Sequence, residues 1–416
     1  MSRTIEPDEA RRLVCERAMP LRRRERVPLA DALGRTLAED LACGTPWPVT
    51  DRSAMDGFAL RGGIAAGAVL RVAGESLAGR PFERPLGAGE AVRIMTGAVV
   101  PSGADAVARV EDTSGFCGLD GDPSRVRIAV PIERGANVRA RGSELVAGQR
   151  VLSAGDVVRA AEIGVLAVLG VTEVQVAARP RVAIVSTGDE VVDASREPAP
   201  HQVRDSNSWA LAAQCIELGA SPLRLGIAPD EAGALCAMLA QGLDADVLLT
   251  IGGVSAGTHD LVHATLAALG VQTVFHGVKL KPGKPLFFGV RETGARRCAV
   301  FGLPGNPASA FTTFDLFVAP LLRGLLGQGT GGSPVTARLR GKPPRANPRT
   351  LAIPARLRTG SDGALHAVLD EVRASGDPFA LVSGDAHAIV PADTVLADGA
   401  VVTVVPYAAT RGVSGA

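Results

Sequence analysis

The chain has 416 residues, of which 46% are hydrophobic, 21% charged and 3% aromatic, and its formal net charge is +1 at pH 7. This length exceeds one ordinary hydrophobic core, so we expect several domains, and the apolar content excludes a disordered chain. The near-neutral charge and the few aromatic residues exclude the broad basic surfaces and stacking platforms of nucleic-acid binders. Any recognition of anions must therefore be local.

The first ten residues are polar and acidic and lack the apolar segment of a secretory signal, and no stretch of about 18 apolar residues could span a membrane. The cysteines show no Cys-x-x-Cys spacing, which predicts buried, reduced thiols. They are Cys15, Cys43, Cys117, Cys215, Cys236 and Cys298. We therefore expect a cytoplasmic protein that binds neither a membrane nor nucleic acid.

Two predicted helices lie on either side of a long region rich in glycine and proline. The first helix is predicted over residues 8–17 and the second over 159–169, just before the most regular part of the sequence. We predict that residues 1–45 and 141–178 form one composite N-terminal and linker domain.

Residues 46–140 show short apolar runs interrupted by glycine and proline, which is typical of a mostly β module. Strands are predicted at 91–95, 105–110 and 125–130. Inside this region, Asp51 to Gly57 follow a Pro-Trp-Pro segment and bring together two carboxylates, a hydroxyl and a glycine. This stretch is either a functional loop or a plain Asx-turn, and both interpretations stay open.

Residues 179–327 alternate short β-branched runs with helical segments, the pattern of an α/β domain. Strands are predicted at 182–185, 247–251 and 299–301, and helices at 205–218, 230–239, 260–269 and 308–325. Asp205, Ser206 and Asn207 are the expected capping side chains of the first helix, and Asp230 is the expected cap of the second.

A glycine-rich tract after Leu326 marks a boundary, and residues 328–416 are predicted to form a small β domain. The fold class expected from these patterns is multidomain α/β plus β, with a central doubly wound α/β domain, a mostly β module and a small C-terminal β domain.

Glycine-bearing loops follow the predicted α/β strands at 186–190, 252–257 and 303–307. Ligands of open α/β sheets bind at the carboxyl ends of the strands, so these loops are expected to gather at one edge. Their backbone N–H groups could hold phosphate. Glycine-rich loops are also common where chains pack closely, and the sequence alone leaves that alternative open.

Lysine is scarce, with Lys279, Lys281 and Lys284 clustered in the run Val-Lys-Leu-Lys-Pro-Gly-Lys-Pro and Lys342 elsewhere. A chain that prefers arginine so strongly is expected to keep lysine where a compact ammonium is needed, because Arg cannot replace it there. The cluster predicts a local anion site.

Two candidate metal sites follow from the spacing of acidic and histidine residues. Asp189 and Glu190 are adjacent carboxylates after a predicted strand, which suits Mg²⁺, although they could equally be a polar turn. His259 and His263 have one-face helical spacing but lack the Glu of a zinc-protease motif, so a solvent-facing or structural role is favoured. No complete dinucleotide-binding glycine fingerprint is present, which disfavours a Rossmann dehydrogenase.

Seven motifs in order closely resemble those of the MoeA-type molybdopterin molybdenumtransferases, a family that includes the C-terminal domain of gephyrin. These are Asp51 to Ala59, Ile94 to Gly97 with Pro101 to Val107, Ser186 to Glu190, Asp205 to Asn207, Gly252 to Ser255 with Asp260, Lys281 to Pro285, and Leu303 to Pro307. The resemblance is strong over about 45–325 and extends to the rest by layout.

The resemblance implies an elongated homodimer of four-domain protomers, in which the α/β unit binds the pterin. It implies a reaction in which molybdate is inserted into adenylylated molybdopterin, AMP is released and Mg²⁺ assists. The same resemblance implies possible contacts with the molybdopterin adenylyltransferase and with molybdoenzyme chaperones.

The implied site combines catalytic, substrate-binding and metal-binding residues. The catalytic set is Asp56, Thr96, Glu190, Lys281 and Lys284. The substrate-binding set is Thr187, Gly188, Asp189, Asp205, Asn207, Gly252, Gly253, Val254, Ser255, Asp260, Pro304, Gly305, Asn306, Pro307, Arg139 and Ser375. The metal set is Asp189, Glu190 and Asp260. By the family analogy, Asp56 and Thr96 complete the site across the dimer interface.

The match has departures and leaves two alternatives. Residues 139–144 read Arg-Ala-Arg-Gly-Ser-Glu where the family has consecutive arginines and an acidic pair, so the roles of Arg139 and Glu144 stay open. Ser375 is expected to bind only peripherally. A molybdopterin adenylyltransferase shares the α/β unit but lacks the module of Asp56 and Thr96, and a scaffold like gephyrin could keep the fold without the activity.

Overall fold

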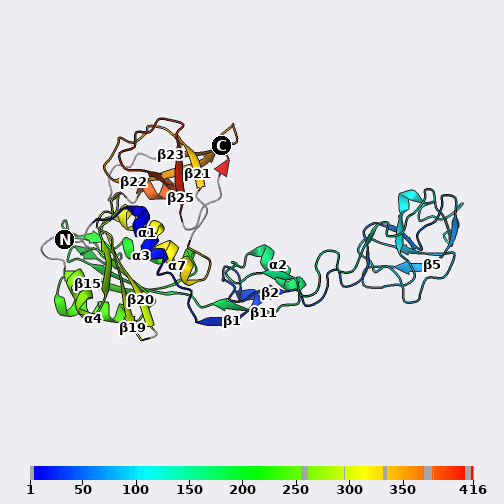
Figure 1. The fold of residues 1–416 in the computed structure, drawn as a ribbon, viewed down its shortest axis with the longest axis horizontal. Helices are drawn as coiled ribbons and strands as arrows, with labels where there is room; N and C mark the ends of the chain where they lie inside the picture. The colour runs from blue at the N-terminus through cyan, green and yellow to red at the C-terminus, as the bar shows by residue number, and fades with distance from the viewer. Residues whose placement is uncertain are drawn as a thin grey trace. The chain divides into compact units, whose positions relative to one another are not determined.

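The structure is a computed structural model that describes residues 4–253, 261–294, 296–330, 335–369, 377, 379–407 and 414–415. The chain divides into two compact units (Figure 1). The larger unit contains Met1–Glu39, Ala154–Ala167 and Val171–Ala416, and the smaller unit contains Asp40–Ser153 with Val168–Gly170.

The smaller unit is built on a five-stranded sheet, as the mostly β prediction required. Its strand order is β7 (Ala106–Arg109), β4 (Gly57–Leu60), β6 (Glu90–Ile94), β5 (Val69–Ser76) and β8 (Arg125–Arg127). Phe58, Leu60 and Ile128 are fully buried in its core. Two short antiparallel pairs accompany the sheet: β3 (Arg52–Ser53) with β9 (Val138–Arg139), and β2 (Leu41–Ala42) with β10 (Arg150–Leu152).

The larger unit contains a six-stranded sheet that confirms the predicted α/β class. Its order is β15 (Ser221–Ala228), β12 (Arg181–Thr187), β16 (Val247–Ile251), β20 (Arg296–Leu303), β19 (Phe287–Thr293) and β17 (Gln272–His276). The first four strands are parallel, whereas β19 runs antiparallel to both of its neighbours. The sequence analysis did not predict β19, because its hairpin with β20 interrupts the βα alternation.

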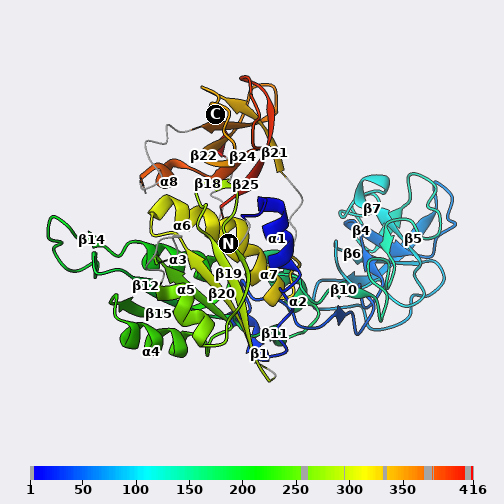
Figure 2. The same cartoon turned by 60° about the vertical axis from the view of Figure 1, so that its left-hand side comes forward.

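Helices cover both faces of this sheet, and alternate residues of its strands pack against the two helical layers. Val182 and Ile184 of β12 pack into one core with α1 (Pro7–Cys15), α3 (Asn207–Glu217) and α7 (Ala319–Leu325). A further helix, α6 (Pro307–Thr313), packs against α3. Ala183 and Val185 pack into the opposite core with α4 (Ala232–Gly242) and α5 (Leu261–Ala268). The alternation follows from the two-residue period of strands, and Figure 2 shows the two helical layers.

Two details of the predicted helices are wrong. Glu231, not Asp230, caps α4, because its carboxylate accepts from the N–H groups of Gly233 (2.8 Å) and Ala234 (2.9 Å). The helix predicted over 308–325 is interrupted by a π-helical turn, Phe314–Val318, between α6 and α7. The N-terminal helix and α2 (Ala160–Val168) lie close to their predicted positions.

The C-terminal strands form a closed ring of five: β22 (Thr350–Thr359), β23 (Leu365–Leu369), β21 (Val335–Arg340), β25 (Val401–Pro406) and β24 (Ala386–Val390), which pairs back with β22. This C-terminal barrel confirms the predicted β domain. Two further strands pair with β22 of the barrel: β18 (Leu280–Lys281), which leaves the α/β region (Figure 2), and β26 (Ser414–Gly415).

The remaining strands form two small pairs in the larger unit, β1 (Arg24–Pro28) with β11 (Glu173–Ala177), and β13 (Val191–Val192) with β14 (Val203–Arg204). Short α8 (Phe379–Ser383) precedes β24. Across the described residues, every helix is too short or too polar to cross a membrane. All six cysteines are free, but Cys117 is exposed, so the expectation that every thiol is buried is wrong.

Candidate functional site

The carboxyl ends of β12 and β16 meet through Thr187 and two glycines. The Thr187 hydroxyl donates to the carbonyl of Ile251 at 3.0 Å, which ties the two strand ends together. Gly252 and Gly253 both have positive φ, +85° and +63°. A Cβ on Gly253 would lie 2.5 Å from Val262, and one on Gly252 would lie 3.0 Å from the Thr187 carbonyl oxygen. Glycine is therefore required here by both conformation and space.

The loop after β20 joins the same edge. The Gly252 N–H donates to the carbonyl of Leu303 at 3.0 Å, and the Asn207 side-chain amide donates to the carbonyl of Gly305 at 2.7 Å. The predicted Leu-Pro-Gly-Asn-Pro turn thus connects the ends of β16 and β20 with the start of α3. Asn306 precedes α6, and Pro307 is its first residue, a position at which the missing proline N–H costs nothing.

Asp189 and Glu190 are exposed beside this edge. The Glu190 carboxylate folds over Gly188, where a side chain would collide with it. Asp189 accepts from the backbone N–H of Asp230 at 3.1 Å, which fixes one of its oxygens. The two carboxylates offer the oxygen ligands that Mg²⁺ prefers.

Asp205 is buried, with 7% of its surface exposed, and its oxygens bond within the protein. They accept from the Ser186 hydroxyl (3.0 Å), the Ser208 N–H (3.0 Å) and the Ser208 hydroxyl (2.7 Å). These bonds satisfy the first turn of α3 and link it to β12. Asp205 therefore fixes the position of neighbouring Asn207.

Lys281 and Lys284 lie on the excursion between β17 and β19, and both are exposed. Gly283 between them has φ +117° and packs so closely on Thr313 of α6 that a Cβ would lie 2.6 Å from its methyl group. The contact joins the lysine loop to α6, the helix that begins at Pro307. Lys279, by contrast, forms an ion pair with Glu6 at 2.5 Å.

Asp56 and Thr96 meet in the smaller unit. Gly57 pairs with Ile94 across antiparallel β4 and β6, so the start of one strand lies beside the end of the other. The Asp56 carboxylate accepts from the Thr96 N–H at 2.7 Å and from the Thr96 hydroxyl at 2.8 Å. These two hydrogen bonds hold the pKa of Asp56 below its ordinary value.

The neighbourhood of Asp56 contains a residue to which the sequence analysis gave no role. Arg52 donates to the carbonyl of Gly97 at 3.0 Å and pairs through β3 with Arg139 of β9. Arg52 lies inside the motif Asp51 to Ala59, which could have marked it as a site residue. Its contact with the Thr-Gly turn could not be predicted from the sequence. Arg139 forms an exposed ion pair with Glu144, the two residues whose roles the sequence left open.

Some predicted site residues lie outside the described residues: Val254, Ser255, Asp260 and Ser375, together with His259. Within the described ranges, no three His, Cys, Asp or Glu side chains are grouped closely enough to form a metal site. Asp189 and Glu190 therefore stand as a pair, and the third predicted ligand, Asp260, is not described. His263 stacks on His276 with 5.5 Å between ring centroids, in keeping with the structural role favoured for it.

Two known families match most of the chain. Residues 5–170 match the family described as "MoeA N-terminal region (domain I and II)". Residues 183–324 match the family described as "Probable molybdopterin binding domain". The second match contains Thr187, Gly252, Gly305 and both exposed lysines, and the first contains Asp56 and Thr96.

Individual relatives agree over most of the chain. The chain is 34% identical to the molybdopterin molybdenumtransferase of Bacillus subtilis, over 94% of this chain and 91% of that protein. It is 38% identical to the enzyme of that name from Nostoc, over 76% of this chain and 72% of that protein.

Solved structures show the same architecture. A crystal structure of the molybdopterin biosynthesis protein MoeA from Pyrococcus horikoshii superposes with a TM-score of 0.80 at 30% identity, covering 97% of this chain and 99% of that one. A second structure from that organism gives 0.78 at 26% identity, covering 97% of this chain and 100% of that one. The chain belongs to the MoeA family of molybdopterin molybdenumtransferases.

Proposed function

We propose that this chain inserts molybdate into adenylylated molybdopterin and releases AMP. The observation that carries the proposal is the junction of three strand ends, at which Thr187, Gly252 and Gly305 are connected by hydrogen bonds. Exposed carboxylates closely follow Thr187 in the chain, and the two lysines lie on a loop that packs against α6. Crevices of this type are where open α/β sheets bind phosphorylated ligands.

The backbone of Gly252, Gly253 and Gly305 can approach the pterin phosphate closely because none of these residues has a side chain. Asn207 is already committed to Gly305, so it stabilises the loop that would receive the ligand. Lys281 and Lys284 supply compact positive charge for molybdate and phosphate oxygens.

Asp189 and Glu190 fit Mg²⁺ by the chemistry of their oxygens, and no hydrogen bond to the Glu190 carboxylate is seen among the described residues. Bound there, Mg²⁺ would withdraw charge from the adenylate phosphoanhydride. Asp189 and Glu190 would hold the ion, and the lysines would hold the anions to be joined.

Asp56 and Thr96 are proposed to act on the same substrate from the β module of a second protomer in a homodimer. The two hydrogen bonds from Thr96 keep Asp56 ionised and fix its orientation. We also propose that the chain has the four domains predicted from the sequence. A cytoplasmic location is part of the same proposal.

The test is an assay of purified protein with adenylylated molybdopterin, Mg²⁺ and molybdate. Molybdate-dependent AMP release is the expected result. Absence of AMP release with the pterin still bound would overturn transfer in favour of a scaffold, and formation of the adenylate from ATP would indicate an adenylyltransferase. Light scattering of the same sample tests the dimer.

A further inference from the structure

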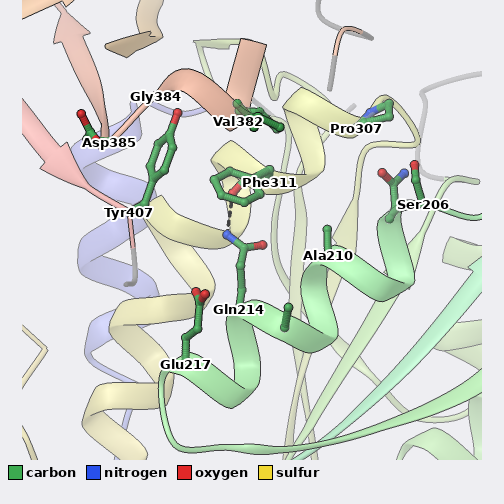
Figure 3. Close-up of a pocket in the computed structure, with 13 residues that line it drawn as sticks. Ser206, Ala210, Gln214, Glu217, Pro307, Phe311, Val382, Gly384, Asp385 and Tyr407 are labelled. Carbon is green, nitrogen blue, oxygen red and sulfur yellow. Dashed lines mark hydrogen bonds between the residues drawn. The ribbon is translucent and has the colours of Figure 1, made fainter. Parts of the chain in front are cut away.

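A hollow of about 360 Å³ lies between α3, α6 and the C-terminal barrel, all within the larger unit (Figure 3). It begins at Asn207 and Pro307 and runs along α3 to Glu217. Those ends of α3 are about 15 Å apart at 1.5 Å per residue, so the Glu217 end is separate from the strand-end junction described above. Its volume is that of a site for a small molecule or a single side chain.

One wall of the hollow contains a buried acceptor that has no donor. Gln214 is 2% exposed, and its amide nitrogen donates to Asp315 at 2.8 Å. The carboxylate of Asp315 accepts that bond, so the orientation of the amide is fixed and Oε1 is the remaining group. Among the described residues, Oε1 has no hydrogen-bond partner. A buried acceptor left in this state carries a desolvation cost that a donor would relieve.

Glu217 lies one helical turn further along α3, and Figure 3 shows its carboxylate beside Gln214 on the side of Tyr407. Partial burial and the nearby Asp315 carboxylate raise the pKa of Glu217. Asp315 itself is occupied by Gln214 and by His387, whose Nε2 lies 3.0 Å from its second oxygen. Glu217 is exposed, and no ion pair or hydrogen bond to its carboxylate is seen among the described residues, so it is the negative charge on this wall that a cation could approach.

The opposite wall is aromatic and apolar. The rings of Phe311 and Tyr407 meet edge to face, with 5.0 Å between centroids. Leu381 and Val382 of α8 complete this lining, and Ala210 adds an apolar side chain on the α3 wall. Asp385 also borders the hollow, but its carboxylate accepts from the N–H of Leu357 at 3.0 Å. Among the described residues that line the hollow, there is no Lys, Arg or His.

A carboxylate, an orphan amide oxygen and two aromatic rings, with no cation among them, are complementary to a positively charged donor. We propose that this hollow binds an organic cation, an ammonium or guanidinium group carried on an apolar stem. The head group lies between Glu217 and the rings of Phe311 and Tyr407, and the stem lies against Ala210 and Val382. The inference is independent of molybdate transfer, because none of these side chains belongs to the proposed catalytic set.

The test uses agmatine as the probe, with butylurea as a neutral molecule of similar shape, in calorimetric titrations of the full chain at low salt. Agmatine is expected to bind saturably and butylurea at least tenfold more weakly, because the charge is lost. No saturable binding of agmatine, or equal binding of butylurea, would overturn the proposal.

Two variants locate the binding. Glu217→Gln is expected to weaken agmatine binding about tenfold by removing the counter-charge, and Ala210→Leu is expected to abolish it by filling the hollow. Glu9→Gln, which removes an exposed carboxylate of α1, is the matched control and should bind as the unaltered chain does. Thermal unfolding confirms that each variant is folded. Unaltered affinity in both hollow variants would place the cation elsewhere and refute the assignment.

The source of the cation is distinguished by a third ligand, an arginine amide with an acetylated N-terminus. Glu217-dependent binding of this compound at least tenfold tighter than that of agmatine points to an arginine side chain of a protein partner. Glu217-dependent binding of agmatine alone points to a free amine. Both outcomes support the cation site, and binding of the two compounds that ignores Glu217→Gln contradicts it.

Discussion

The two regions that carry the proposed chemistry are organised differently. At the strand-end junction, glycines and backbone groups predominate, and the exposed Glu190 carboxylate lies over Gly188 beside them. In the β module, one carboxylate is already held by its partner, since Asp56 accepts two hydrogen bonds from Thr96. The first region is shaped to admit a ligand, and the second presents a pre-oriented ionised group. This difference teaches that binding and chemistry can be assigned to separate parts of the chain.

The largest effect is expected from Asp56→Asn, which tests whether binding and chemistry are assigned to different parts of the chain. Loss of an oriented carboxylate is expected to lower the rate of AMP release about a hundredfold or more, with pterin affinity nearly unchanged because Asp56 lies outside the α/β unit. Single-turnover AMP release and direct pterin titration measure the two quantities.

The matched control is Asp122→Asn, because Asp122 is also held by a neighbouring N–H and hydroxyl, those of Ser124, in the same module. This variant should retain activity. A large loss of pterin affinity in Asp56→Asn would show that the division between binding and chemistry is wrong.

Substitutions of single lysines test which of them bind the anionic ligands. Lys284→Ala is expected to weaken binding of pterin phosphate and molybdate about tenfold at low salt, because a charge-assisted hydrogen bond is lost. Lys279→Ala is the control from the same cluster, since Lys279 is paired with Glu6. Equal effects of the two substitutions would point to general electrostatic attraction and remove Lys284 from the site.

Glycine substitution tests whether the junction requires close approach. Gly253→Ala combines positive φ with a collision against Val262, whereas Gly270→Ala has a similar φ, +82°, and open space. Alanine at Gly270 is expected to cost about 1–2 kcal/mol for its left-handed backbone, and alanine at Gly253 should cost more. Chemical denaturation measures both free energies of unfolding. If the two costs are equal, the predicted collision contributes nothing.

Acid sensitivity tests a structural carboxylate of the β module, that of Glu90. Glu90 is buried, and its bonds with Arg84 and the Gly87 N–H lower its pKa to about 2. A depressed pKa stabilises the fold above the unfolded value near 4.5, and this contribution is lost as the pH falls towards 2. Glu90→Gln should therefore destabilise the protein at pH 7 and match the unaltered chain near pH 2. A gap in the denaturation midpoint that is constant with pH would contradict this.

Much of this architecture was predictable, because the α/β strands are short β-branched runs and the loops that follow them contain glycine. β16 was predicted residue for residue, and the gathering of Thr187, Gly252 and Gly305 follows from parallel strands. The antiparallel β19 was missed because its hairpin with β20 contains no helix. The cap of α4 was misplaced by one residue because both Asp230 and Glu231 can accept from a first turn.

Contacts between residues far apart in the chain could not be predicted from the sequence. The distance between Asp56 and Thr96 depends on strand register, which a single sequence does not specify. The same holds for the hollow lined by Gln214, Glu217 and Tyr407, whose walls come from segments nearly 200 residues apart in the chain. Resemblance to a family gave Asp56 and Thr96 a shared role, and the structure added their direct hydrogen bonds.

The pairing of β18 with β22 has a mechanical consequence. Lys281 is a member of that short strand, so the C-terminal barrel anchors one side of the lysine loop while Gly283 is pressed against α6 on the other. A chain truncated after Leu326 would keep every lysine of the cluster and yet lose the support that orients it. The barrel thus supports the position of the lysine charges, although none of these lysines belongs to the barrel itself.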